Sequence, residues 1–220
     1  RFTTFMASPA IEPSIASGRT TLRAMPYSEI GDLLARTEFD TAIFQTSPMD
    51  TKGQYSFAHS CDMPPIVWPM AERRIVFVNE QMQSLPHAES MPAEAVDLAV
   101  PINEPLLSPA PGGRRSAAVD EIARLVAELV PDGATFQAGI GDTPAAIVSA
   151  LKLHRGLRVH SGIITQEYQQ LAESGALDMA AEHVSGIAWG DAAFRSWLPQ
   201  SGCVFRSVVE THGHDELAAI

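Results

Sequence analysis

Stretches typical of β-strands alternate with stretches typical of α-helices along almost the whole chain. Strand patterns, rich in Val, Ile, Phe and Thr, are expected at residues 1–7, 20–25, 40–46, 74–79, 95–100, 134–138, 157–160, 183–189 and 203–209. Helical patterns are expected at residues 28–36, 63–72, 117–130, 144–153, 165–173, 191–198 and 215–219. Because parallel strands need a crossover connection, such alternation builds parallel sheets covered by helices. The sequence therefore predicts an α/β fold with parallel sheets flanked by helices.

A boundary between two parts of the chain is expected at residues 101–113, which hold four prolines and two glycines. We expect an N-terminal α/β domain at residues 1–107 and the beginning of a C-terminal α/β domain at residues 114–220. Both ends interrupt predicted elements, so we expect the first domain to lack its start and the second to lack its end. The helix expected directly after the boundary would bury a stripe formed by Val119, Ile122, Val126 and Leu129.

Composition and charge exclude several classes of protein. Apolar residues make up 45% of the chain and charged residues 19%, which is typical of a globular protein. The formal net charge of −11 argues against a nucleic-acid partner. No apolar run reaches the length of a membrane span, so no membrane partner is expected. Cys61 and Cys203 are too few for a disulfide framework, which favours a reducing, cytoplasmic location.

The most informative local pattern is a strand, a glycine-rich turn and a helix start within residues 134–148. Gly139 and Gly141 allow a sharp turn, and Thr143 and Pro144 are suited to a helix N-cap and first helical position. Free N–H groups at such a turn can hold an anion or a developing oxyanion. A plain strand–helix turn without a ligand would carry the same residues, and the pattern alone leaves both interpretations open.

Known nucleotide-binding patterns do not fit this turn. A dinucleotide fingerprint requires a third glycine where Pro144 stands and an acidic residue about twenty positions on. The residue at that distance is Ser161. A phosphate loop requires Gly-Lys-Ser/Thr after the turn, which is missing. A nicotinamide dehydrogenase is therefore disfavoured.

Three loops follow predicted strands at residues 46–56, 137–144 and 160–162. Ligands of parallel α/β folds bind beyond the carboxyl ends of the strands. These loops fall on both sides of the predicted boundary. A binding cleft between two halves is therefore expected.

The same loops carry a resemblance to a known family. The segment Phe44-Gln-Thr-Ser-Pro-Met-Asp-Thr-Lys-Gly-Gln-Tyr-Ser56 resembles S-P-x-D-x-x-G-Y-x-S, with Gln54 inserted. Residues 78–82 resemble V-N-x-x-M, and residues 136–144 resemble Q-x-G-I-G-x-x-P. His160-Ser161 and residues 171–175 resemble H-S-E followed by L-x-x-x-G. Together, and in this order, they resemble the acetyl-CoA hydrolase/transferase family, the class I CoA-transferases such as butyrate and 4-hydroxybutyrate CoA-transferases.

The resemblance implies two similar α/β halves with the active site between them, and ping-pong CoA transfer from an acyl-CoA to a small carboxylate. A glutamate attacks the thioester and becomes a glutamyl-CoA thioester. Coenzyme A would be a substrate, with no permanently bound cofactor and no metal, and a homo-oligomer is expected. The oxyanion-loop candidates are Gln137 and Gly139; the CoA-binding candidates are Gly139, Ile140, Gly141 and Pro144. The substrate-pocket candidates are Asp50, Tyr55, Asn79 and His160.

Two departures from the family pattern matter. The family's attacking glutamate is expected in an N-S-x-x-E segment beyond Ile220, so no catalytic residue is assigned within this chain, which alone should be inactive. Gly162 stands where the family has a glutamate after His-Ser. Hydrolysis by an acyl-CoA hydrolase of the same family, or a non-catalytic acyl-CoA-binding module, therefore remain as alternatives.

Other combinations of reactive side chains are weaker. His212 and His214 could bind a metal, but histidines at such positions are usually solvated. A Cys–His nucleophile would need Cys61 beside His59 or His160, with no oxyanion element evident nearby. Ser161 lacks the nucleophile elbow of a serine hydrolase, so a turn after a strand is the simpler interpretation.

Overall fold

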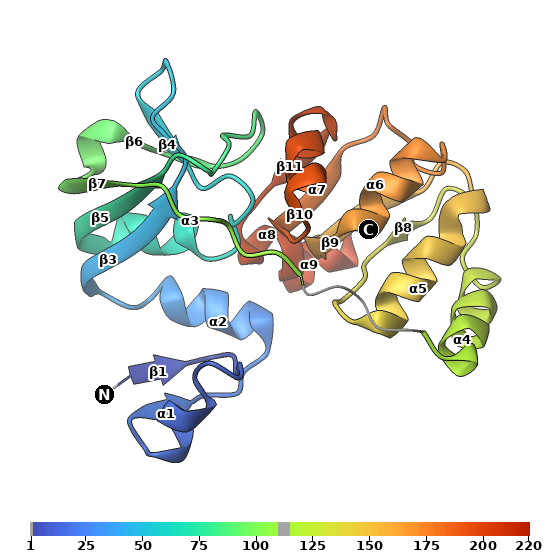
Figure 1. The fold of residues 1–220 in the computed structure, drawn as a ribbon, viewed down its shortest axis with the longest axis horizontal. Coiled ribbons are helices and arrows are strands. Elements are labelled where there is room, and N and C mark those ends of the chain that lie inside the picture. The colour runs from blue at the N-terminus through green and yellow to red at the C-terminus, as the bar shows by residue number, and fades with distance from the viewer. Residues whose placement is uncertain (1, 110–114) are drawn as a thin grey trace.

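A computed structural model describes residues 2–109 and 115–220 (Figure 1). Its two larger sheets are both parallel. The first has the order β3-β5-β7, with strands Phe39–Thr46, Ala71–Asn79 and Leu98–Ile102. The second has the order β11-β10-β9-β8, with strands Cys203–Phe205, His183–Ala188, Arg158–Ile164 and Thr135–Phe136. The α/β prediction with parallel sheets flanked by helices is confirmed.

Smaller elements complete the N-terminal half. A parallel pair, β1 (Phe2–Thr4) and β2 (Thr20–Leu22), is connected by α1 (Glu12–Ala16). Helix α2 (Tyr27–Leu34) leads into the first sheet. Strands β4 (Gln54–Ser56) and β6 (Ser90–Pro92) form an antiparallel pair. Helix α3 (Pro64–Val67) is short, and 3₁₀ turns lie at Trp68–Met70, Ala93–Ala95, Leu151–Leu153 and Leu198–Gln200.

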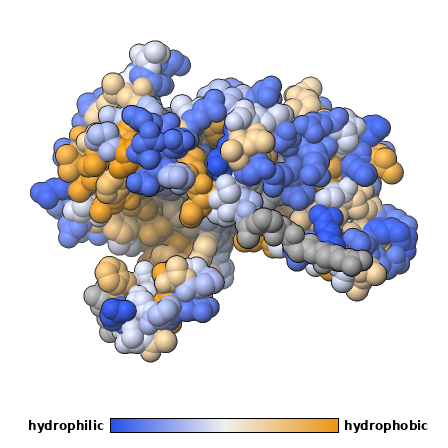
Figure 2. Space-filling model, in the orientation of Figure 1, coloured by the Kyte–Doolittle hydropathy of each residue, from blue (hydrophilic) through white to orange (hydrophobic). Residues whose placement is uncertain are grey.

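The three-stranded sheet is apolar on both faces. Along β3, Ala42, Phe44 and Thr46 are buried in the core. The opposite face exposes Ile43, Phe77 and Leu98. Figure 2 shows hydrophobic residues gathered on the part of the surface where this sheet lies. Parallel sheets usually have both faces covered, and in this part of the chain only one face is covered.

Helices cover the second sheet (Figure 1). They are α4 (Ala117–Ala127), α5 (Asp142–Ala150), α6 (Gln166–Glu173) and α7 (Ala192–Trp197). Helices α8 (Val208–His212) and α9 (His214–Ala218) lie between the halves (Figure 1). Within the described residues, no helix is long and apolar enough to cross a bilayer.

The two halves share one hydrophobic core. Phe57 from the first half and Phe205 from the second are both fully buried in it. The Cys61 N–H donates to the Gly186 carbonyl at 2.8 Å across the junction. The predicted boundary overlaps β7, which runs to Ile102, and residues 110–114 lie outside the described part. The domain limits at 107 and 114 remain predictions, as does the strand's start at Arg1.

The predicted stripe of α4 was wrong in two positions. Ile122 is 44% exposed and Leu129 is 81% exposed. The buried positions are Ala123 and Ala127, because small side chains allow α4 to pack closely on α5.

Three predicted boundaries were also wrong. Residues 63–72 form only a short helix and a 3₁₀ turn, because β5 already begins at Ala71. Strand β9 continues to Ile164, since it pairs with β10 over that length, so His160, Ser161 and Gly162 lie in a strand and not in a loop. Strand β11 ends at Phe205, because a capping box of Ser207 and Glu210 starts α8.

Candidate functional site

The glycine turn connects β8 to α5 and is the centre of the candidate site. Helix α5 begins at Asp142 with Gly141 as its N-cap, so the prediction of Thr143 as N-cap was wrong. Gly141 has φ +123°, a conformation that residues with a Cβ rarely adopt. A residue with a Cβ would be strained at this N-cap position. Pro144 lies in the first turn, where its missing N–H costs nothing.

The turn presents unused backbone donors. Among the described residues, no protein group accepts a hydrogen bond from the N–H of Gly139, Ile140 or Gly141. These donors lie at the positive end of the nine-residue helix α5. Ile140 is 67% exposed, and a Cβ built on Gly139 meets nothing within 4 Å. The turn is therefore open on one side and suited to hold a negative oxygen.

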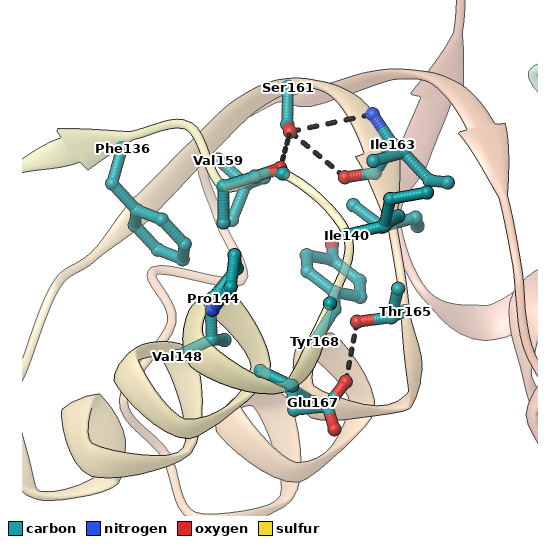
Figure 3. A pocket seen from close by; sticks show the side chains of 15 residues that line it. Phe136, Ile140, Pro144, Val148, Val159, Ser161, Ile163, Thr165, Glu167 and Tyr168 are labelled. Atoms are coloured by element: carbon teal, nitrogen blue, oxygen red, sulfur yellow. Dashed lines mark hydrogen bonds between the residues drawn. The ribbon is translucent and has the colours of Figure 1, made fainter. Parts of the chain in front are cut away.

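Strand β9 supports the turn from the other side. The Ser161 hydroxyl is buried and donates either to the Ala138 carbonyl at 3.1 Å or to the Ile163 carbonyl at 2.9 Å (Figure 3). Ser161 therefore has a structural partner on each side, which explains its burial without a hydrolase role.

Two cavities adjoin the turn. The smaller has a volume of about 50 Å³ and lies between the turn, Pro144, Ser161 and Tyr168 (Figure 3). It has room for a group of a few atoms. The larger has a volume of about 680 Å³ and reaches from Ile140 to Trp189. That volume is in the range of ligand sites.

Side chains of α6 line both cavities, and sequence reasoning missed them. Glu167 faces the turn and accepts a hydrogen bond from the Thr165 hydroxyl at 2.5 Å (Figure 3). Tyr168 is buried beneath, and burial raises its pKa. The helix itself was expected at residues 165–173, but its place beside the turn follows from the parallel pairing of β8 with β9, which the local sequence does not encode.

Comparison with known proteins places this geometry in a family. No family model matches the sequence. The chain is 30% identical over 185 residues to a succinyl-CoA:acetate/propanoyl-CoA:succinate CoA transferase of Fasciola hepatica, covering 82% of this chain and 38% of that protein. It is 29% identical over 150 residues to a butyryl-CoA:acetate CoA-transferase of Anaerostipes caccae, covering 66% of this chain and 34% of that protein. The chain belongs to the CoA-transferase family.

Solved structures support the family fold. RipA from Yersinia pestis matches with a TM-score of 0.88 at 22% identity, over 99% of this chain and 54% of that chain. A 4-hydroxybutyrate CoA-transferase from Porphyromonas gingivalis matches with a TM-score of 0.83 at 22% identity, over 98% of this chain and 58% of that chain. The chain thus spans about half of these structures and less than two fifths of the two sequence relatives.

The structure divides the site residues expected from the family into two groups. Gly139, Ile140, Gly141 and Pro144 line the smaller cavity. Gln137, the other oxyanion-loop candidate, and the four substrate-pocket candidates line neither cavity at the turn; the latter are Asp50, Tyr55, Asn79 and His160. The roles of both groups remain predictions.

Hydrogen bonds within the N-terminal half account for the positions of Asp50 and Asn79. The Asp50 carboxylate accepts from the N–H groups of Lys52 and Gln54 at 2.8 Å each, which closes a turn before β4. Tyr55 follows in β4 and is half-buried. Asn79 is buried at the end of β5, where its side chain donates to the Glu104 carbonyl at 2.9 Å.

Position 162 carries the departure from the family pattern, and His212 fills the space beside it. A Cβ built on Gly162 would lie 2.1 Å from His212 Cε1 and 2.8 Å from Nε2. His212 Nε2 in turn lies 3.3 Å from Nε2 of Gln137. The side chain that the family places at this position would therefore compete with His212 for space next to Gln137.

The other reactive groups are explained by burial. Burial raises the pKa of the Cys61 thiol to about 12 and lowers the pKa of His59 to about 4, so the pair is a neutral thiol and a neutral imidazole. In the described part of the chain, no group of three or more His, Cys, Asp or Glu side chains could hold a metal ion.

Replacing Gly162 by alanine should destabilise the protein by about 1–3 kcal/mol, because the new methyl group overlaps the His212 ring. Urea unfolding of the full-length protein measures this cost. The same substitution in a His212→Ala background provides the control, since the space is then free. An equal cost in both backgrounds would contradict the contact.

Proposed function

We propose that the full-length protein transfers coenzyme A between an acyl-CoA and a small carboxylate, through a glutamyl-CoA thioester. The observation that carries this proposal is the row of unused N–H donors at Gly139, Ile140 and Gly141, open to a cavity, in a chain whose relatives are CoA-transferases. Acyl transfer builds negative charge on a carbonyl oxygen, which such donors stabilise.

The proposed transfer passes through an anhydride and then a glutamyl-CoA thioester. The enzyme's glutamate carboxylate attacks the carbonyl carbon of the acyl-CoA thioester, whose oxygen is held by the turn. An anhydride between the acyl group and the glutamate forms, and CoA leaves as a thiolate. The thiolate then attacks the enzyme's carbonyl carbon, which releases the first acid and leaves CoA on the glutamate. A second carboxylate reverses these steps and takes the CoA. Hydrolysis by the same site requires only that water replaces the second carboxylate.

The prediction that the attacking glutamate lies beyond Ile220 is kept as part of this proposal. Glu167 is the described glutamate that lines both cavities, but Thr165 already occupies one of its oxygens. One observation favours the alternative of a non-catalytic acyl-CoA-binding module. At position 162 the chain has a glycine, and His212 fills the space that a larger side chain would need.

The test uses the full-length protein incubated with acetyl-CoA and then reduced with borohydride, which converts a glutamyl thioester to an alcohol. Peptide mapping by mass spectrometry should find one reduced glutamate, located beyond Ile220. Reduction of Glu167 would move the nucleophile into this chain. Binding of acetyl-CoA with no reduced glutamate would support the binding module and contradict the transferase.

A further inference from the structure

His212, the last residue of α8, lies where four separate parts of the chain meet. Its ring packs edge-on against Tyr27 of α2, with ring centroids 4.9 Å apart. It rests on Gly162 of β9, and it contacts Gln137 at the start of the glycine turn. Tyr27 in turn donates to the Asp62 carboxylate at 2.5 Å. The N-terminal half therefore reaches the turn through this imidazole.

One placement of protons satisfies all three hydrogen bonds around His212 and Thr211. The Thr211 hydroxyl donates to the Ser207 carbonyl at 3.2 Å, so its oxygen is free to accept from His212 Nδ1 at 2.9 Å. Nδ1 then carries the proton, and Nε2 is left as an acceptor. The Gln137 amide nitrogen, at 3.3 Å, is the donor that Nε2 needs.

The glycine at position 162 is what makes this contact available. Any Cβ there would come within 2.1 Å of the imidazole and push it away from the turn. The hydroxyl of Ser161, the neighbouring residue of β9, lies 3.1 Å from the Ala138 carbonyl and can donate to it. Two consecutive residues of the turn, Gln137 and Ala138, are thus fixed from outside it, directly before the unused donors at residues 139–141.

We propose that His212 is a positioning residue for the glycine turn. In this role the unprotonated Nε2 holds the Gln137 side chain and thereby sets the orientation of the N–H groups at residues 139–141. The role of the turn in binding an acyl-CoA rests on the proposed function, whereas the contact between His212 and Gln137 does not.

Protonation of His212 reverses the contact. A protonated ring has a donor at Nε2 that faces the Gln137 amide donors, so the amide has to turn over or move away. The titratable groups facing His212 are Tyr27, Asp62 and His160. Burial, followed by the neighbouring His160, lowers the pKa of His212, whereas Asp62 raises it. The ring is therefore neutral at pH 7, as the positioning role requires.

Two variants separate shape from hydrogen bonding. His212→Phe keeps a flat ring against Tyr27 and Gly162 but has no acceptor. It should weaken acetyl-CoA binding by the full-length protein about fivefold at pH 8, the effect of one hydrogen bond. His212→Gln keeps an acceptor that does not titrate, so it should bind like the wild type at pH 8. Its affinity for acetyl-CoA should also fall less on acidification than that of the wild type, because glutamine is not protonated.

Isothermal titration calorimetry with acetyl-CoA between about pH 5.5 and about pH 8 measures these affinities. The proposal is overturned if His212→Phe binds as tightly as the wild type, or if His212→Gln behaves like His212→Phe. A merely structural role would not give the rescue by glutamine together with the loss of pH dependence.

A second readout needs no ligand, so failure of the proposed function does not hide the result. Nitrogen NMR of histidine-labelled full-length protein should show His212 as the Nδ1–H form, with an Nε2 signal that shifts on Gln137→Leu substitution. An Nε2–H form, or a signal unaffected by that substitution, would overturn the positioning role even if acetyl-CoA binds.

Discussion

Replacing Gly141 by alanine is expected to weaken acetyl-CoA binding by the full-length protein about tenfold or more. Gly141 has φ +123° and is the N-cap of α5, so a Cβ forces the turn out of this conformation. Strain of this kind costs about 1–3 kcal/mol, and relieving it moves the N–H groups of residues 139–141. Equilibrium binding of acetyl-CoA measures the loss.

Gly133→Ala is the matched control for this substitution. Gly133 also has positive φ, +77°, with nothing within 4 Å of an added Cβ, and it lies before β8, outside both cavities at the turn. It should lower thermal stability and leave the affinity for acetyl-CoA unchanged. If both variants bind like the wild type, the conformation of the turn is not what holds the ligand.

Acidification from pH 7 to pH 5 is expected to destabilise the fold, because burial keeps certain histidines neutral in the folded state while they become protonated in the unfolded state. Burial, followed by the charge of Arg195, lowers the pKa of His59 to about 4. The unfolded chain binds this proton near the usual pKa of about 6.5, so the unfolded state gains protons first as the pH falls. His59 alone then costs the folded state about 2 kcal/mol between pH 7 and pH 5.

His183 acts in the same direction. It is fully buried, and burial lowers its pKa. Its Nδ1 accepts from the Val159 N–H at 3.1 Å while Nε2 donates to the Asp178 carbonyl at 3.1 Å, so both nitrogens are used in the neutral form. Protonation at Nδ1 would remove the bond to Val159.

Urea unfolding at several pH values measures this dependence, and His59→Gln is the variant that isolates one contribution. Glutamine does not titrate, so its free energy of unfolding should fall less steeply between pH 7 and pH 5 than that of the wild type. Parallel slopes for the two proteins would mean that His59 is protonated equally easily in the folded and unfolded states.

The sequence predicted those parts of the site that depend on local patterns. Alternating strand and helix patterns were enough for the parallel sheets, and the glycines of the turn were enough to predict its place between β8 and α5. The helix start was misplaced by two positions, because residue preferences favour Thr143 as a cap whereas the backbone conformation makes Gly141 the cap. The capping box of Ser207 and Glu210 was readable in the sequence and would have ended β11 correctly.

Other features depend on contacts between distant residues. The stripe of α4 was misassigned because Ile122 and Leu129 have the size of core residues, whereas close packing on α5 selects alanines. The contact between Gln137 and His212 joins residues 75 positions apart, and no periodicity encodes it. The one sequence feature that pointed to this contact was Gly162, which departs from the family pattern. The neighbouring His212 imidazole explains this departure, because it leaves no space for a Cβ.

The proposed CoA transfer depends on the glycine turn holding the thioester oxygen. A crystal structure of the full-length protein with a stable ketone analogue of acetyl-CoA, in which a methylene group replaces the sulfur, tests this most directly. The ketone oxygen should lie about 3 Å from N–H groups of residues 139–141, with the pantetheine chain in the cavity that reaches Trp189. An analogue bound elsewhere, with these N–H groups facing only solvent, would contradict the role of the turn in CoA transfer.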